Sequence, residues 1–194
     1  MVIMPQESSF LRKAKDAWLV LQTKAGKEES YGAIYDRYFR IIYQYIYFKV
    51  SSQENAEDLT ADVFFKVWQF IRSGKSVKNL RSLLFTAARN AVIDYYRKSK
   101  FDPFPKNAEE LVEDTQVNVF DEVEKSDDRE LLSAALDTLS TEEREVVLLR
   151  YTHELSFKEI GAIVGKRSGA VRVSVHRARK KLKKVLENKQ KGDM

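Results

Sequence analysis

The segment from Ser140 to Leu186 reads STEEREVVLLRYTHELSFKEIGAIVGKRSGAVRVSVHRARKKLKKVL. It contains two pairs with the spacing of a capping box, in which a serine and a glutamate three residues later bond each other's backbone N–H groups at the start of a helix: Ser140 with Glu143, and Ser156 with Glu159. Gly165 stands where a helix that ends in the left-handed conformation favours glycine. The spacing predicts two short helices and a turn followed by a long basic helix, which is the layout of a DNA reader.

The long helix, which Ser168 can cap, has an apolar face and a cationic face. Its apolar residues recur every three or four positions, at Val171, Val175, Ala178, Leu182 and Val185. The opposite face carries Arg172, Val173, His176, Arg177 and Lys180. A helix of this kind, held by a shorter one across a tight turn, fits the major groove of DNA. The alternative is a basic amphipathic helix that lies on a membrane surface or is simply solvated.

The whole chain is predicted to be all-α. With 43% hydrophobic residues, 3 prolines and 7 glycines in 194 residues, it has long segments of 3.6-residue periodicity and no convincing alternating ones. It has no cysteine, which excludes disulfides and cysteine-ligated zinc. His153 and His176 lack the companions of a metal site or a catalytic triad. We therefore expect no catalytic residues, no metal and no cofactor.

The N-terminal sequence Met-Val-Ile-Met-Pro lacks the cationic and apolar regions of a signal peptide. No run approaches the ~18 apolar residues that are needed to span a bilayer. We expect a cytoplasmic protein with no membrane insertion.

Charge divides the chain into parts. Residues 71–100 contain 8 Lys or Arg against 1 Asp or Glu, and residues 155–194 contain 12 against 3. Between them, residues 101–128 contain 2 basic and 10 acidic residues. Two basic parts separated by an acidic one indicate two nucleic-acid contacts joined by a flexible linker. We predict two small helical domains, residues 1–100 and 129–194, with the linker at 101–128.

Two helices are predicted at the start of the first domain. Residues Phe10 to Lys24 form the first, ended by Gly26, and it has among its apolar positions Leu11, Trp18 and Leu21. The second, about Glu29 to Val50, has apolar and aromatic residues at helical spacing, which indicates core packing: Ile34, Tyr35, Tyr38, Ile41, Ile42, Tyr45 and Ile46.

Ser51 and Glu54 have the spacing of a further capping box, for a helix that runs to about Ile71. One face of this helix is apolar, with Leu59, Val63, Val67 and Phe70. The other face has Glu54, Asp58, Asp62, Phe65 and Gln69, with Trp68 at its margin. Acidic residues alone would simply be solvated, whereas large exposed rings among charges are typical of a surface that binds a protein.

A polar turn at residues 73–79 precedes a helix from Leu80 to about Lys98. One side of this helix is apolar, and a second side interleaves cations with rings, at Lys78, Arg81, Phe85, Arg89 and Tyr96. Rings that stack on unpaired bases, beside cations that hold phosphates, are typical of single-stranded nucleic-acid binding. The same pattern fits the tyrosine-rich edge of a core with solvated arginines, so both interpretations stay open.

Four segments resemble one known family: NAEDLTADVFFKVW at 55–68, LLFTAARNAVIDYYR at 83–97, LSFKEIG at 155–161 and VHRARKKL at 175–182. They are similar to the bacterial sigma-70 factors called extracytoplasmic-function (ECF) sigma factors. The resemblance implies a promoter-specificity subunit that binds core RNA polymerase, through the beta-prime clamp and the beta flap, and promoter DNA, with an anti-sigma factor as a further partner. The alternative is a helix-turn-helix regulator that acts without being a polymerase subunit.

Carried over by position, the resemblance assigns a role to three groups of residues. The polymerase-binding group is Asp58, Asp62, Phe65 and Trp68. The group at the downstream element and melted strand is Lys75, Lys78, Asn79, Arg81, Arg89, Asn90, Tyr96 and Arg97. The group at the upstream element is Arg167, Arg172, Val173, His176, Arg177 and Lys180. One departure is Glu154, which stands where the family often has glycine.

Overall fold

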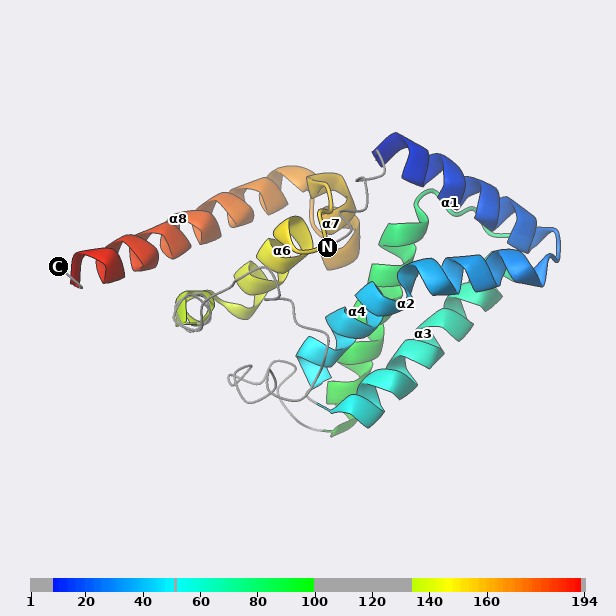
Figure 1. Ribbon diagram of the computed structural model, residues 1–194, viewed down its shortest axis with the longest axis horizontal. Coiled ribbons are helices and arrows are strands. Elements are labelled where there is room, and N and C mark those ends of the chain that lie inside the picture. Colours follow the sequence, from blue (N-terminus) through cyan, green and yellow to red (C-terminus); the bar gives the residue numbers. More distant parts are fainter. Residues whose placement is uncertain (1–8, 51, 100–133, 193–194) are drawn as a thin grey trace, which may run out of the picture. The chain divides into compact units, whose positions relative to one another are not determined.

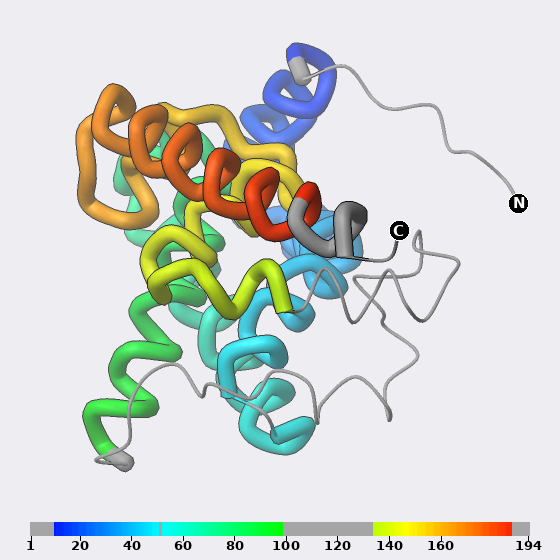
Figure 2. The backbone as a smooth tube through the Cα atoms, turned by 90° about the vertical axis from the view of Figure 1, so that its left-hand side faces the viewer, coloured from blue at the N-terminus to red at the C-terminus, as the bar shows by residue number. Residues whose placement is uncertain are grey.

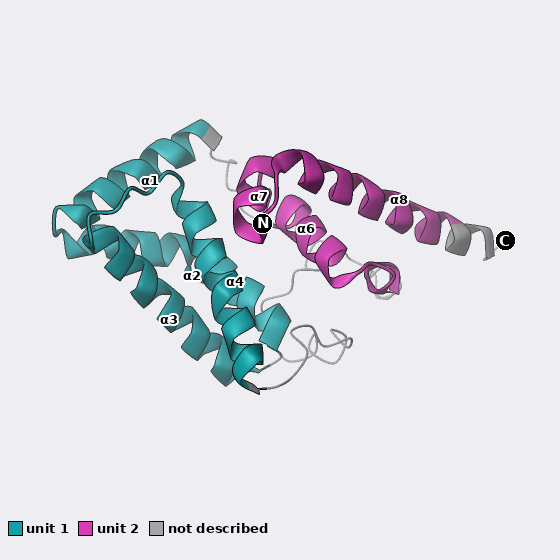
Figure 3. Cartoon of the chain, turned by 180° about the vertical axis from the view of Figure 1, so that it is seen from behind, with its two compact units in different colours: residues 1–101 teal, residues 102–194 magenta. Residues whose placement is uncertain are grey.

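The computed structural model describes residues 9–50, 52–99 and 134–192. Within these ranges the regular structure is entirely helical, so the predicted all-α class is confirmed (Figure 1). The chain divides into two compact units, residues 1–101 and 102–194 (Figure 3). The predicted linker, residues 101–128, lies outside the described residues.

The first unit contains α1 (Ser9–Lys24), α2 (Glu28–Val50), α3 (Gln53–Arg72) and α4 (Leu80–Ser99). Helix α2 packs against α1, α3 and α4, and α3 packs against α4, so that α2, α3 and α4 lie side by side (Figure 2). Their inward stripes form the core, with fully buried side chains that include Ile34, Ile42, Ile46, Val63, Val67, Ile71 and Leu84.

A buried polar contact joins α1 to α2. The Tyr38 hydroxyl donates to the Asp16 carboxylate at 2.5 Å, and the Arg37 guanidinium lies 3.7 Å from the same carboxylate. Burial, together with the hydrogen bond to Asp16, raises the pKa of Tyr38. The contact also removes the one acidic residue of α1 from its surface.

Helix α1 has apolar residues on two opposite faces. Leu19 and Val20 are buried against the core, whereas four large apolar side chains are 57–79% exposed: Phe10, Leu11, Trp18 and Leu21. The helix and its end before Gly26, which has a φ of +94°, are as predicted. The apolar positions that the sequence singled out, however, lie on the outer side of the helix.

Helix α3 begins one residue later than predicted. Its N-cap is Ser52, whose Oγ accepts a hydrogen bond from the Asn55 N–H at 3.3 Å. The predicted capping box of Ser51 with Glu54 is therefore wrong, although the capping role of a serine at this point is right. Two adjacent serines give two overlapping cap patterns, and Ser52 satisfies the backbone here.

The second unit contains α6 (Thr141–Tyr151), α7 (Phe157–Val164) and α8 (Ser168–Gly192), and residues 134–137 are also helical. Both predicted capping boxes are formed, by Ser140 with Glu143 and by Ser156 with Glu159. Gly165 ends α7 in the left-handed conformation, with a φ of 72°. The predicted pair of short helices, turn and long helix is confirmed.

The turn from α7 to α8 passes very close to α7. The Lys166 N–H donates to the Gly161 carbonyl at 2.9 Å. A Cβ atom at position 161 would lie 2.5 Å from the Lys166 carbonyl oxygen, which is closer than non-bonded atoms approach. Glycine at 161 therefore sets how tightly the helix-turn-helix can fold.

Ion pairs tie α6 to the rest of the second unit. The Lys181 Nζ donates to Glu143 at 2.7 Å, and the Lys166 Nζ, in the turn, pairs with Glu142. The hydrogen bond from Lys181 is the main cause that holds the pKa of Glu143 below its ordinary value. Beneath these pairs, Leu139, Val147 and Ala178 form a buried apolar cluster.

Candidate nucleic-acid and polymerase interfaces

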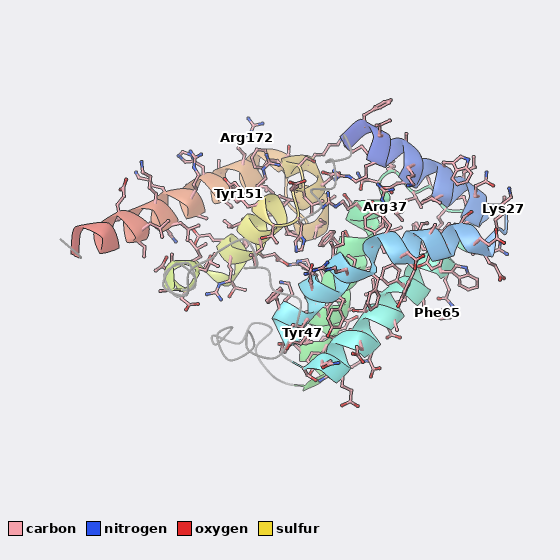
Figure 4. All side chains as sticks on the ribbon, viewed as in Figure 1. Lys27, Arg37, Tyr47, Phe65, Tyr151 and Arg172 are labelled. Atoms are coloured by element: carbon pink, nitrogen blue, oxygen red, sulfur yellow. The ribbon has the colours of Figure 1, made fainter. Side chains whose placement is uncertain are left out.

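The outer face of α3 carries an aromatic pair among acids. Phe65 is 56% exposed, and its ring stacks on that of Trp68 with the ring centroids 6.0 Å apart. Asp58 and Asp62 are exposed on the same helix, α3, on which Figure 4 labels Phe65. Aromatic anchors ringed by charge are typical of a surface that a protein partner covers.

The inner face of α3 is firmly packed at the same level. Phe64 and Val67 are buried, and the Tyr31 hydroxyl on α2 donates to the Phe64 carbonyl. Burial raises the pKa of Tyr31, so this hydroxyl stays protonated and remains a donor. Phe65 is therefore exposed because it lies on the outer face of α3, and not because this helix is loosely packed.

The turn between α3 and α4 presents two exposed lysines. The Lys75 Nζ lies 5.4 Å from the Phe70 ring centroid, and Lys78 is exposed further along. Asn79, which the resemblance assigned to DNA, uses its Oδ1 to accept a hydrogen bond from the Ser82 N–H at 2.8 Å. Its amide therefore caps the start of α4.

The residues of α4 that were predicted to contact a nucleic-acid strand fall into two sets, one exposed or half-buried and one buried. Asn90 and Arg97 are exposed and Arg89 is half-buried, while the Arg97 guanidinium lies 3.1 Å from Asp94. Arg81 and Tyr96 are buried, with 8% and 7% of their surface exposed. Only the exposed set can meet a nucleic-acid strand without a rearrangement of the core.

The buried set belongs to an aromatic edge of the core. The Tyr96 hydroxyl donates to the Lys49 carbonyl, and the Phe85 ring packs edge-on against Tyr45 with the centroids 5.3 Å apart. The side chains of Arg81 and Tyr96 are enclosed in this structure, so their contact with a melted strand would require them to be uncovered, and it stays a prediction. The alternative that the sequence left open, a tyrosine-rich core edge with solvated arginines, describes Tyr96, whereas Arg81 is buried and not solvated.

Helix α8 has the predicted division into two faces. Val171, Val175 and Ala178 are buried, at 4% exposure or less. The residues assigned to the upstream element are all exposed, in the turn or on α8: Arg167, Arg172, Val173, His176, Arg177 and Lys180. Their contact with DNA stays a prediction.

Arg172 differs from its neighbours because an aromatic ring orients it. Its guanidinium carbon lies 5.4 Å from the ring centroid of Phe157, at the start of α7 (Figure 4). The guanidinium carbon of Arg150 lies 5.1 Å from the same centroid, and Arg150 also donates to the Leu155 carbonyl at 3.0 Å. Cations over a ring face are held by its quadrupole. Phe157 thus links the position of Arg172 to α6 and α7.

Sequence reasoning missed Phe157 and Arg150. Both are ordinary residues at helix positions, and the three partners of this contact are far enough apart in the chain that no spacing motif connects them. The only available signal was an aromatic residue at the first position of α7, followed by a helix with an arginine near its start.

Among residues 9–50, 52–99 and 134–192, no group of three His, Cys, Asp or Glu side chains could hold a metal ion. None of the helices in those ranges combines the length and the apolar character that crossing a membrane requires.

Comparison with known families finds two matching models. The model for sigma-70 region 2 matches residues 34–102, and the model for sigma-70 region 4 matches residues 129–182. The chain is 31% identical to the ECF RNA polymerase sigma factor BldN of Streptomyces coelicolor, over 87% of this chain and 64% of that relative. It is 30% identical to the ECF RNA polymerase sigma factor SigW of Bacillus subtilis, over 87% of this chain and 95% of that relative.

Solved structures of the same architecture are also known. The sigma factor RpoE of Bartonella quintana, solved in complex with the anti-sigma factor NepR, matches with a TM-score of 0.61 and 25% identity. The match covers 82% of this chain and 98% of that one.

Proposed function

We propose that promoter recognition is divided between the two units of this chain, which belongs to the ECF family of RNA polymerase sigma factors. As a sigma factor it is a promoter-specificity subunit, which binds core RNA polymerase, recognises promoter DNA and helps to open it at the start of transcription. The observation that carries the division is that an exposed aromatic and acidic face on α3 and an exposed cationic face on α8 lie on different units. The chain itself binds and positions, and it performs no catalysis.

In the first unit, α3 binds the beta-prime clamp of the polymerase. Phe65 and Trp68 are the anchors, since their stacked rings gain most when a partner covers them. Asp58 and Asp62 form the charged rim, which steers and aligns the approach. Anchoring by the rings and alignment by the acids together explain why acidic and large aromatic residues share the outer face of α3.

The same unit holds the opened promoter strand. Lys75 and Lys78 in the turn, with Asn90 and Arg97 on α4, offer exposed donors to phosphates and to unpaired bases. A base that flips out of the stack is captured at the turn, residues 73–79. Arg81 and Tyr96 support this surface from the core.

In the second unit, α8 enters the major groove at the upstream element. Arg172 and Arg177 can each pair with a guanine edge, whereas Val173 can touch a thymine methyl group. Lys180 lies further along the helix, where phosphates come within reach. The remainder of this unit contacts the beta flap.

An anti-sigma factor is the remaining partner. The relative RpoE binds one, and the faces proposed here for polymerase and DNA are the surfaces whose occupation would silence this chain. The acidic residues 101–128 join the two units, so that both contact the same promoter.

The proposal is tested by capture of core polymerase on the full-length protein. The double variant Asp62→Lys with Trp68→Ala should lose capture while its helix content and thermal stability stay nearly unchanged, because Asp62 is exposed and Trp68 is only half-buried, at the margin of the same face. A matched control, Asp36→Lys with Trp18→Ala, makes the same two chemical changes at exposed positions of α2 and α1.

The control should capture polymerase as the parent chain does. Equal capture by the two double variants would remove the polymerase contact from α3. A parent chain that binds promoter DNA and never captures polymerase would favour the alternative, a helix-turn-helix regulator that is not a polymerase subunit.

A further inference from the structure

Helix α1 carries an exposed apolar stripe that the proposed function does not use. It lies before residue 34, where the region 2 match begins. Within its 16 residues, four large apolar side chains are 57–79% exposed: Phe10, Leu11, Trp18 and Leu21. At about 100° per residue, these four share one face with the exposed Ala14 and Ala17. That face points directly away from the one that buries Leu19 and Val20.

Cations border the stripe on both sides. By the same helical geometry, Lys13 and Lys24 lie along one edge, where the Lys24 Nζ donates to the Gly74 carbonyl at 3.2 Å, and Lys15 lies along the other. The one carboxylate of α1, that of Asp16, is buried beneath the Tyr38 hydroxyl. The outward surface of α1 is therefore apolar along its centre, and the charged residues along its edges are all lysines.

We propose that α1 binds this sigma factor to a membrane surface that contains anionic phospholipid. A helix that lies in the interface buries its apolar stripe at the level of the acyl chains and turns its charged edges towards the headgroups. The long side chains of Lys13 and Lys15 can reach those headgroups from opposite edges while their methylene groups stay against the apolar surface. Trp18, near the middle of the stripe, is the residue type that favours this boundary.

The charge pattern argues for this occupant over the other candidates. A second copy of α1 would bring lysines against lysines, because the one carboxylate of this helix, that of Asp16, is buried. A protein partner would need a groove with an acidic rim on both sides of a single convex helix. An anionic bilayer supplies an apolar layer, and negative charge on both sides of the helix, without the shaped groove that a protein partner would need.

The test uses the full-length protein with Trp68→Phe, so that Trp18 is the only tryptophan of the chain. The protein is titrated with vesicles of phosphatidylcholine mixed with phosphatidylglycerol, and with vesicles of phosphatidylcholine alone. The expected result is a blue shift of Trp18 emission and co-sedimentation with the mixed vesicles, both weaker at high salt. No shift with the mixed vesicles overturns the proposal.

Paired variants identify the helix responsible. Phe10→Ser with Leu21→Ser should lower the partition coefficient by about a hundredfold or more, because each buried large apolar side chain contributes a factor of about ten or more. The matched control Ile93→Ser removes an apolar side chain that is 36% exposed on α4 and should leave partitioning unchanged.

The charges are tested in the same way. Lys13→Gln with Lys15→Gln should weaken binding by about fivefold per lysine. The control pair Lys183→Gln with Lys184→Gln, on the basic helix α8, should have no effect. Loss of binding in the α8 pair alone would assign the lipid contact to α8 and overturn the proposal.

Thermal unfolding of the Phe10 and Leu21 variant distinguishes a docking surface from a packed one. An unchanged unfolding temperature supports an outer stripe that does not stabilise the fold. A clear decrease would mean that the stripe packs within the chain, and capture of an acidic protein in place of vesicles would make its partner a protein.

Discussion

Replacing Phe157 with leucine should weaken recognition of the upstream promoter element through Arg172. The Phe157 ring lies 5.4 Å from the Arg172 guanidinium, and leucine keeps an apolar side chain there but removes the π face. A cation–π contact at a partly exposed site is worth about 0.5–1 kcal/mol. Freed from the ring, Arg172 must lose that much more conformational freedom when it binds, so affinity should fall by about two- to fivefold.

The assay is fluorescence anisotropy of a labelled upstream-element duplex with the full-length protein, arranged as a double-mutant cycle. Phe157→Leu should lower affinity in the parent chain and have no further effect in an Arg172→Ala background. Phe157→Tyr, which keeps the ring, should restore parental affinity. In an Arg177→Ala background, Phe157→Leu should keep its full effect.

One result would refute this coupling. If Phe157→Leu lowered affinity equally with and without Arg172, the ring would act on the fold of the second unit as a whole. The orientation of Arg172 by Phe157 would then be irrelevant to DNA binding.

Three further predictions concern the second unit. Gly161→Ala should destabilise it by about 1–3 kcal/mol in denaturant unfolding, because the new Cβ meets the Lys166 carbonyl, whereas Gly169→Ala, with no atom within 4 Å of its Cβ, should be tolerated. Arg177→Ala should relax selectivity at one or two upstream base pairs, whereas Lys183→Ala should weaken all sequences alike and lower the salt slope by about 0.9. Because Lys181 holds the pKa of Glu143 below its ordinary value of 4.5, the ionised carboxylate contributes stability above that pH, and the contribution is lost as the pH falls through the lowered pKa. Lys181→Gln should therefore reduce the difference in unfolding free energy between about pH 6 and about pH 3.

Local signals predicted the second unit well. The capping boxes at Ser140 and Ser156 and the left-handed Gly165 each depend on a few neighbouring residues, so the sequence contains all of their chemistry. Glu154 shows the same locality. It stands where the related family often has glycine, and it has a positive φ of 49°. A backbone conformation that favours glycine is here occupied by glutamate.

Tertiary features of the first unit could not be predicted in this way. Periodicity marked Trp18 and Leu21 as apolar positions, but a helix with two apolar faces does not show which face is inside. The side chains of Tyr96 and Arg81 each have an apolar part and a polar end, so the sequence is equally compatible with a solvent-exposed surface and with the edge of the core. Only the packing of α4 against α2, with the Tyr96 hydroxyl on the Lys49 carbonyl, distinguishes the two.

The hydrogen bond from Tyr31 to the Phe64 carbonyl has a consequence for how such a factor can diverge. It fixes α3 through backbone atoms, at the level where the side chain of the next residue, Phe65, points outward. Mutations at Phe65 or Asp62 therefore leave this anchor intact, and selection can alter the fit to polymerase or to an inhibitor in small steps. After gene duplication, two copies can acquire different partners on this helix while both keep the same fold.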